Sequence, residues 1–171
     1  MQQKEIYFAA GCFWGTERLY QSIRGVTATQ CGFANGKQEV NAPSYQQVCT
    51  GTTDCREAVH VIYNPEEVTL PQLLKAYFSV VDPTVYNRQG NDVGSQYQAG
   101  IYCIEEESLQ TVRAYCEKEA GKYPVFAVEV GLLQKFYPAE EYHQNYLMKN
   151  PTGYCHISPA EFASIDDLIR R

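Results

Sequence analysis

The sequence predicts an α+β fold in which helices pack mainly on one face of a mixed β-sheet. An apolar run opens the chain, a clear helical stripe lies near its middle, and strand-like and helix-like patterns alternate around them. The predicted order is strand, helix, strand, strand, helix, strand. That order is the split βαβ pattern of ferredoxin-like folds, extended here by long loops and a coiled C-terminal tail.

The first three elements follow from local patterns. The apolar run from Ile6 to Ala10 predicts a buried strand over residues 4–10, and a helix is predicted over residues 14–23. A glycine then opens a second extended segment over residues 25–33.

A strand and the clearest helix come next. Residues 57–63 alternate as a strand does. Over residues 70–81, apolar side chains recur at i, i+3, i+4, i+7, i+8 and i+11, which is one face of a helix. Thr69 begins a capping-box pattern, and Asp82-Pro83 stops the helix.

The second half is interpreted in the same way. Residues 100–104 predict a short strand, and the glutamates that follow favour the start of a helix over residues 105–120. Residues 126–133 predict another strand. A proline and two glutamates predict a helix over residues 138–149.

Two connections are too long for ordinary turns. Residues 32–56 and 82–98 are polar and are predicted to be mostly without regular structure. Compact domains rarely contain such loops unless the loops build a site. We therefore expect a functional site that draws residues from both.

Length and composition limit the class of protein. The 171 residues carry a net charge of −6 and are 44% hydrophobic and 20% charged, which fits one globular domain. No long apolar stretch predicts a membrane span, and no basic block predicts a nucleic-acid surface. No secretion signal is recognisable, so we expect a cytoplasmic protein, with a monomer as the default.

The seven cysteines indicate thiol chemistry rather than a disulfide framework. They are residues 12, 31, 49, 55, 103, 116 and 155. Their number is odd, no pair has Cys-x-x-Cys spacing, and none clusters with a histidine. We therefore expect no metal site and divide these cysteines between structural and redox thiols.

Cys12 is the leading candidate for a nucleophile. It lies at the predicted turn from the first strand into the first helix, where free backbone N–H groups and the helix dipole stabilise a thiolate. Phe13 and Trp14 follow it and are placed to wall an apolar slot. This arrangement predicts chemistry on a small apolar group.

Four side chains are candidates to assist that nucleophile. Glu57 begins a predicted strand, and a carboxyl buried there would have a raised pKa and act as a proton donor. Tyr45 and Tyr97, one in each long loop, offer hydroxyls to an oxygen that gains charge. Asp92 lies near Tyr97 in the sequence. The ordinary alternatives are a solvated glutamate, packing tyrosines and a turn aspartate.

Cys155 is the candidate for a second redox thiol. Proline and glycine precede it, which predicts a coil near the C-terminus. A cysteine on such a coil can reach a sulfenic acid and condense with it to a disulfide. The alternative is an incidental tail thiol.

The segments around these candidates form an ordered set of motifs. The set begins with Gly11-Cys12-Phe13-Trp14-Gly15 and continues through residues 43–51, 57–59, 82–84, 87–97, 136–144 and 153–155. In this order the motifs resemble the peptide methionine sulfoxide reductases of the A type. Their succession from about residue 4 to 156 makes the resemblance specific.

The resemblance implies the roles in the chemical step. Cys12 would attack the sulfur of methionine-S-sulfoxide, either free or in oxidised proteins and peptides, and become a sulfenic acid. Phe13 and Trp14 would hold the methyl group of the substrate. Glu57 would supply a proton to the sulfoxide oxygen.

The resemblance also implies the supporting roles and the recycling. Tyr45 and Tyr97 would hydrogen-bond the sulfoxide oxygen, and Asp92 would help to form the pocket. Cys155 would resolve the sulfenic acid to a disulfide with Cys12, which thioredoxin would reduce. The family needs no metal or organic cofactor, and dithiothreitol serves as the reductant in vitro.

The chain departs from the family pattern just before Glu57. The family usually reads Gly-His-Ala there, whereas this chain reads Asp54-Cys55-Arg56. Arg56 would lower the pKa of Glu57 if it turned inward, opposing the effect of burial. Strand alternation would put Cys55 on the Glu57 face.

Other cysteines offer alternatives to Cys155. Cys31, Cys49 and Cys55 lie in or beside the first long loop and are further candidates to resolve a sulfenic acid. Cys103 and Cys116 fit a strand and a helix stripe, so we predict that they are structural.

The domain organisation follows from the same motifs. We expect one catalytic domain over residues 1–171, with a core of about residues 4–156. Residues 157–171 form an extension with a capping-box pattern at Ser158 and helical spacing after it.

A different class of function is a thiol redox sensor that binds oxidised methionine without repairing it. The sequence argues against this class because it carries both a candidate acid and a candidate resolving thiol. A methionine-release assay with separated sulfoxide epimers distinguishes the two.

Overall fold

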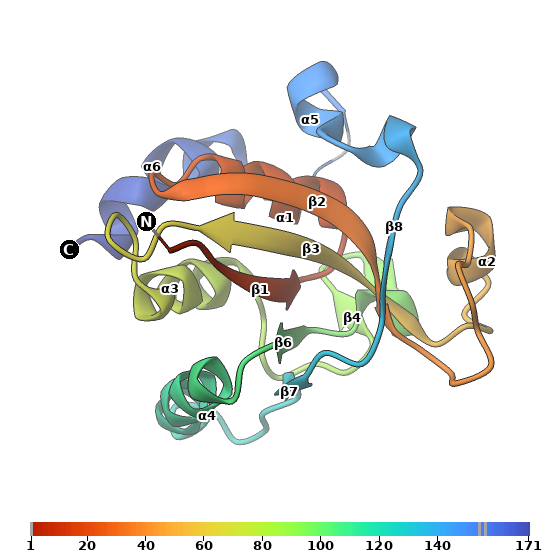
Figure 1. Cartoon of the computed structure of the whole chain (residues 1–171), viewed down its shortest axis with the longest axis horizontal. Helices are drawn as coiled ribbons and strands as arrows, with labels where there is room; N and C mark the ends of the chain where they lie inside the picture. Colours follow the sequence, from red (N-terminus) through yellow and green to blue (C-terminus); the bar gives the residue numbers. More distant parts are fainter. Residues whose placement is uncertain (1, 154, 156) are drawn as a thin grey trace.

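The computed structural model describes residues 2–153, 155 and 157–171 and shows a two-layer α+β fold (Figure 1). A six-stranded sheet has the order β7-β6-β1-β3-β2-β8. Its strands are β1 (Lys4–Ala9), β2 (Val26–Asn35), β3 (Cys55–Tyr63), β6 (Gly100–Cys103), β7 (Glu129–Leu132) and β8 (Phe136–Pro138). The pair β6–β7 is parallel and the other pairs are antiparallel, so the sheet is mixed as predicted.

The four central strands confirm the split βαβ core. In chain order they are β1, β2, β3 and β6, and their spatial order is β6-β1-β3-β2. The connections are α1 (Phe13–Gln21) between β1 and β2, and α3 (Leu70–Val80) between β3 and β6. β7 and β8 extend this core at its two edges.

The remaining elements are short or lie near the C-terminus. They are α2 (Tyr45–Cys49), β4 (Arg88–Gln89), β5 (Asp92–Val93), the 3₁₀ turns η1 (Ser95–Tyr97) and η2 (Glu141–His143), α4 (Glu106–Ala120), α5 (Tyr146–Lys149) and α6 (Pro159–Ile169). Among the described residues, no helix combines the length and apolar character needed to cross a membrane.

Strand alternation divides β1 between two layers of packing. Ile6 and Phe8 are fully buried in the main core, where they meet apolar side chains of α1, α3, α4 and α6. Tyr7 and Ala9 point to the opposite face and belong to a smaller cluster. The helices therefore cover one face, as predicted, and in Figure 1 the strands lie in front of α1 and α3.

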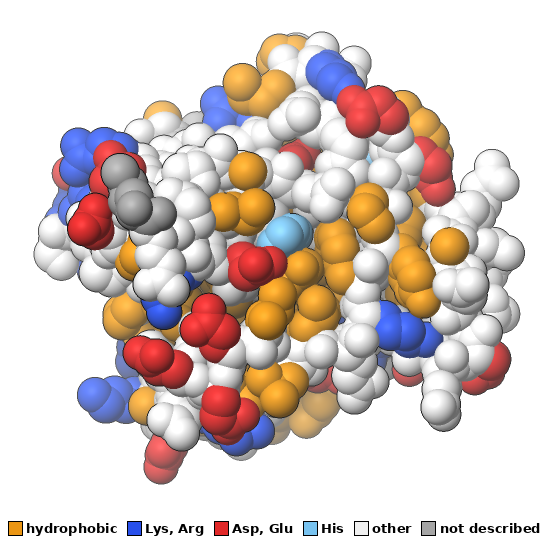
Figure 2. Space-filling model, in the orientation of Figure 1, with side chains coloured by type: hydrophobic (Ala, Val, Ile, Leu, Met, Phe, Trp, Pro, Cys, Tyr) orange, Lys and Arg blue, Asp and Glu red, His pale blue; other side chains and the backbone are white. Residues whose placement is uncertain are grey.

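The second face is covered by the connection from β7 to β8. Leu133 and Phe136 pack against the smaller cluster, and Tyr7 stacks on His60 with ring centroids 4.3 Å apart. Figure 2 shows this face, with apolar side chains gathered around a histidine near the middle of the view. Because both faces are covered, β1 and β3 are buried along most of their length.

The helix predicted over residues 70–81 is confirmed as α3. Its buried face is formed by Leu73, Leu74 and Tyr77, and Thr69 accepts a hydrogen bond from the N–H of Gln72 in a complete capping box. Local periodicity and capping are sufficient here because each signal lies within the helix itself.

The helix predicted over residues 138–149 is wrong. Its place is taken by the end of β8, η2 and the single turn α5, and Asn145 has a left-handed φ of 55° that interrupts any continuous helix. The side-chain amide of Gln144 bonds both the N–H and the C=O of Cys31 on β2, at 2.8 and 2.9 Å. A long-range contact with the sheet thus overrides the local helix signal.

Two other predictions need correction. The strand predicted over residues 126–133 is regular only over β7, and the loops 32–56 and 82–98 contain α2, β4, β5 and η1. In α2, Ser44 accepts from the N–H of Gln47 and the Gln47 side chain accepts from Ser44 N–H. This capping box was readable in the sequence.

The C-terminal extension docks on the core. Ile165 and Ile169 of α6 are buried in the main cluster. The guanidinium of Arg170 donates to the carbonyl oxygens of Arg24 and Glu67, at 2.7 and 2.9 Å. The predicted helical character of residues 157–171 is therefore observed, and α6 closes over α1 and α3.

Candidate active site

Cys12 occupies the sharp turn between β1 and α1. Gly11 has a φ of 85°, which favours glycine and lets the chain reverse directly into the helix. Cys12 is the N-cap residue of α1, and its carbonyl accepts from the N–H and the hydroxyl of Thr16, at 3.4 and 3.2 Å. Its side chain is 7% exposed, so the thiol lies at the edge of the core.

Glu57 reaches the same turn from β3. Its Oε1 accepts from the backbone N–H of Phe13 at 3.2 Å, and the residue is 1% exposed. Burial raises the pKa of Glu57 to about 8 and the charge of Asp92 adds to this, while the hydrogen bond from Phe13 opposes it. Glu57 is therefore a neutral acid near neutral pH, which agrees with the expectation for a buried carboxyl.

The second oxygen of that carboxyl is available for a ligand. Glu57 Oε2 is buried, and no described residue hydrogen-bonds it. Burying a polar atom without a hydrogen-bond partner costs free energy. The position of this oxygen therefore favours a site in which a polar ligand supplies the missing hydrogen bond.

The thiol of Cys12 differs from the expectation. Burial raises its pKa, and the charge of Glu57 raises it further. The N–H groups of Trp14 and Gly15 lower it, as expected at a helix N-terminus, but their effect is smaller. The direction is therefore opposite to the predicted stabilisation of a thiolate, because desolvation outweighs the helix end.

Two tyrosines surround the carboxyl. Tyr45 begins α2 and Tyr97 ends η1, and after burial the charge of Glu57 is the next cause that raises the pKa of each hydroxyl. The charges of Asp92 and Cys12 also raise the pKa of Tyr97. Both phenols are therefore protonated donors in the Cys12 site, and the two long loops contribute to it as predicted.

An aromatic wall completes the site. Phe13 is buried against Tyr45 and His143, with ring centroids 6.1 and 5.4 Å apart. Trp14 stacks on Tyr146 at 3.9 Å, and its Nε1–H donates to His143 Nδ1 at 3.0 Å. The rings predicted to form an apolar slot thus lie beside Cys12.

His143 is a site residue that the candidate set missed. It is 2% exposed, and burial lowers its pKa while Glu140 opposes this, so the imidazole is neutral and accepts from Trp14. The signal was present, because His143 lies in the motif 136–144. Its partner Trp14 is 129 positions away, which no local pattern reveals.

Glu17 was missed for a similar reason. It is buried on α1, where Oε1 accepts from Asn145 N–H at 2.7 Å and Oε2 accepts from the Thr29 hydroxyl at 2.9 Å. Glu17 therefore holds the chain just beyond His143 against the first helix. A charged residue within a helix that packs on the sheet was the available signal.

All seven cysteines are free thiols. Cys31 is buried and donates to Glu17 at 3.3 Å, and the charge of Cys12 contributes to its raised pKa, although burial is the main cause. Cys49 is exposed beside Tyr45, with which it shares a side-chain hydrogen bond. Cys55 packs in the main core, on the helix side of β3.

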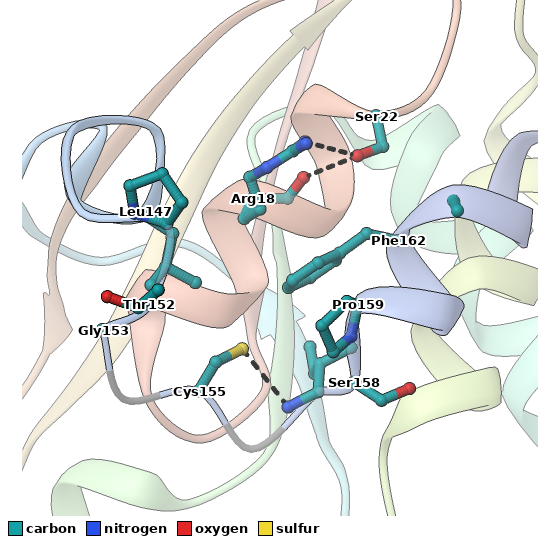
Figure 3. A pocket seen from close by; sticks show the side chains of 12 residues that line it. Arg18, Ser22, Leu147, Thr152, Gly153, Cys155, Ser158, Pro159 and Phe162 are labelled. Atoms are coloured by element: carbon teal, nitrogen blue, oxygen red, sulfur yellow. Dashed lines mark hydrogen bonds between the residues drawn. The ribbon is translucent and has the colours of Figure 1, made fainter.

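Cys155 forms no disulfide with Cys12 in this structure. It lies in a pocket of about 690 Å³ between α1, α6 and the segment after α5, lined in part by Arg18 and Phe162 (Figure 3). The Cys155 sulfur accepts from Ile157 N–H at 3.3 Å, and Cys12 is not among the lining residues. Tyr154 of the motif 153–155, and His156, lie outside the described residues.

The described residues hold no cluster of three or more His, Cys, Asp or Glu side chains arranged for a metal ion. The chemistry that the arrangement itself supports is nucleophilic attack by sulfur with proton donation from a carboxylic acid.

Comparison with known proteins agrees with this chemistry. The family model for peptide methionine sulfoxide reductase matches residues 4–167. The peptide methionine sulfoxide reductase MsrA of Clostridium acetobutylicum is 48% identical over 155 residues, which cover 90% of this chain and 94% of that protein.

Solved structures give the same result. Reduced Mxr1 from Saccharomyces cerevisiae superposes with a TM-score of 0.85 and 38% identity, covering 90% of this chain and 89% of that one. Mxr1 in complex with Trx2 shares the fold, with a TM-score of 0.60, 24% identity and 85% coverage of each chain.

Proposed function

We propose a mechanism that starts from one premise: this chain belongs to the peptide methionine sulfoxide reductase family and reduces methionine-S-sulfoxide. In the first step, Glu57 protonates the sulfoxide oxygen, which otherwise leaves poorly, the Cys12 sulfur attacks the sulfoxide sulfur, and the thiol proton of Cys12 passes to the Glu57 carboxylate. The hydroxyl on the substrate sulfur then transfers to the Cys12 sulfur, as the transient S–S bond and the original S–O bond break and a new S–O bond forms. Cys12 is oxidised by two electrons to a sulfenic acid, and methionine departs with its sulfur reduced by two electrons.

The surrounding side chains orient the substrate for that step. The methyl group of the substrate lies against Phe13 and Trp14, whose rings exclude water. Tyr45 and Tyr97 donate hydrogen bonds to the oxygen as it gains charge. Asp92 lies close enough to Glu57 to help keep its carboxyl protonated.

A second thiol returns the enzyme to its reduced form. Cys155 attacks the sulfenic acid, water leaves, and a Cys12–Cys155 disulfide forms. Thioredoxin reduces this disulfide, a proposal favoured by the complex of Mxr1 with Trx2. Dithiothreitol replaces thioredoxin in vitro. We further propose that residues 1–171 act as one catalytic domain without a metal or organic cofactor.

The single observation that carries this mechanism is the buried carboxyl of Glu57 at the Cys12 turn. One of its oxygens is held by Phe13 N–H, and the other has no partner among the described residues. Its raised pKa provides a proton at neutral pH, at the place where the sulfoxide oxygen would bind.

The test is methionine release from separated sulfoxide epimers with dithiothreitol. We expect Cys12→Ser to abolish turnover of the S epimer, because a hydroxyl is a much weaker nucleophile than a thiol and its oxygen cannot be oxidised as sulfur is to a sulfenic acid. The matched control is Cys116→Ser, because Cys116 is a buried cysteine of α4. This variant should retain activity. Turnover by the Cys12→Ser variant would exclude the mechanism.

A further inference from the structure

Arg56 lies next to Glu57 in the sequence but on the other face of β3. Its guanidinium donates to both carboxylate oxygens of Glu129 on β7, at 3.0 and 3.2 Å. It also donates to the carbonyl and the carboxylate of Asp54, each at 2.9 Å. The side chain is 12% exposed, so this is a well-ordered bidentate pair rather than a loose surface contact.

Arg56 does not turn toward the Glu57 carboxyl. Successive residues of a strand point to opposite faces, so Glu57 faces the helices while Arg56 faces Glu129. Two carboxylates neutralise the guanidinium, and Arg56 is not among the causes of the Glu57 pKa. The paired guanidinium on the far face of β3 is therefore placed to affect the reaction through position.

A fifth hydrogen bond joins Arg56 to the 3₁₀ turn that contains Tyr97. Its Nη1 donates to the carbonyl oxygen of Ser95 at 3.2 Å, and Ser95 is the first residue of η1. The same carbonyl accepts from Gln98 N–H at 3.2 Å, and this bond closes the single turn that carries Tyr97. A single 3₁₀ turn has few internal hydrogen bonds, so an external tie contributes much of its order.

The two carboxylates that pair with Arg56 are themselves held in place. Glu129 accepts a hydrogen bond from the Tyr102 hydroxyl at 2.6 Å, which ties β7 to β6. Asp54 has a left-handed φ of 55°, a conformation that aspartate tolerates better than most residues. Asp54 and Arg56 replace glycine and alanine of the family pattern, and these two departures form an ion pair with each other.

We infer that Arg56 is a positioning residue, which holds η1 against β3 and thereby sets the Tyr97 hydroxyl relative to the Glu57 carboxyl. The inference rests on the proposed function, since it requires Tyr97 to hydrogen-bond the sulfoxide oxygen. Small displacements of such a donor are costly, because a misplacement of about 1 Å can reduce a rate by ~100-fold.

A double-mutant cycle on the single-turnover rate of sulfoxide reduction tests the inference. We expect Arg56→Met to slow this step by roughly 10-fold in the parent protein, and to have no further effect once Tyr97→Phe has removed the hydroxyl. In a Tyr45→Phe background, Arg56→Met should keep its full effect. Arg113→Met, which removes an exposed arginine of α4, is the matched control.

Arg56→Lys separates position from charge. An ammonium keeps the charge but does not reproduce the planar fork, so we expect Arg56→Lys to be slowed like Arg56→Met, with an unchanged pH profile. A full rate in Arg56→Lys, or a shifted pH profile in either variant, would show that the charge of Arg56 is what matters and would overturn the inference.

The remaining outcomes also decide between the two proposals. If Arg56→Met and Tyr97→Phe multiply their effects, the positioning role is wrong while the proposed function stands. If Tyr97→Phe leaves the single-turnover rate unchanged, the proposed role of Tyr97 fails and the inference fails with it. Thermal unfolding of each variant verifies folding, and Glu129→Gln, which weakens the same network without touching β3, replaces Arg56→Met if that variant does not fold.

Discussion

The two cysteines proposed to exchange electrons, Cys12 and Cys155, lie in regions of opposite character. Cys12 lies between a central strand and its helix, with Glu57, Phe13 and Trp14 already in contact around it. Cys155 is half-buried in a separate pocket, on a segment between the single turn α5 and α6. The proposed attack therefore uses side chains already placed around Cys12, whereas the proposed resolution requires Cys155 to form a bond that this structure does not contain.

The Cys155 segment is nevertheless attached at both ends. Leu147 precedes it and Ile157 follows it, and both side chains are buried. The docking of α6 fixes the second attachment through Ile165 and Ile169. Any approach of Cys155 to Cys12, as the proposed resolution requires, is therefore limited by buried side chains on both sides of it.

Substitution of Cys155 tests directly whether this thiol regenerates the enzyme. We expect Cys155→Ser to release one methionine per enzyme at the parental rate and then to stop under thioredoxin-driven conditions. The measurement is a burst experiment with thioredoxin, thioredoxin reductase and NADPH, with Cys103→Ser as the control. Continued turnover would identify Cys31, Cys49 or Cys55 as the resolving thiol.

Substitution of Glu57 tests whether this carboxyl supplies the proton in the chemical step. General acid catalysis typically contributes ~10²–10⁴-fold, so we expect Glu57→Gln to slow the single-turnover step by about that factor. Because the pKa of Glu57 is raised to about 8, the acid form is present below pH 8 and is lost as pH rises through it.

The Glu57-dependent part of the single-turnover rate should therefore fall as pH rises through about 8 in the parent protein. The Glu57→Gln variant should lack this fall, because glutamine does not titrate. A parental fall that persists in Glu57→Gln would assign it to another group.

The aromatic wall offers a smaller perturbation of the same region. Trp14→Phe keeps a ring but leaves the buried His143 Nδ1 without its donor, which costs about 1–3 kcal/mol. We expect kcat/KM for the sulfoxide to fall about 10-fold with little change in fold. Tyr146→Phe keeps the stack on Trp14 and should change kcat/KM much less; equal effects would argue against a role for the His143 hydrogen bond.

The mildest change concerns the anchor of the tail. Ile165→Val removes one buried methylene and should lower the free energy of unfolding by about 1 kcal/mol, measured by urea denaturation. The single-turnover rate should stay the same, while the rate of disulfide formation with Cys155 should change. An altered single-turnover rate would show that α6 is coupled to the Cys12 region.

The sequence predicted best the elements whose signals are local. The strand at residues 4–10 and the helix at residues 70–81 were recognisable because their periodicity and caps lie within the elements. The helix over residues 138–149 failed because β8 pairs with β2 and Gln144 binds Cys31, contacts that span about 100 residues.

The site divides in the same way. Sequence motifs identified four of the candidates, and the structure brings them together: Cys12, Glu57, Tyr45 and Tyr97. Their electrostatics were not identifiable, because the pKa of Cys12 depends on how much water the fold excludes. The tyrosine and tryptophan partners of His143 also come from the tertiary fold.

The alternation of side chains along β3 has a consequence for how charge is distributed around the site. Arg56 and Glu57 are neighbours in the sequence, yet their side chains lie on opposite faces of the sheet. One strand can therefore hold a charged, ion-paired side chain and a buried proton donor at adjacent positions, because each faces its own surroundings.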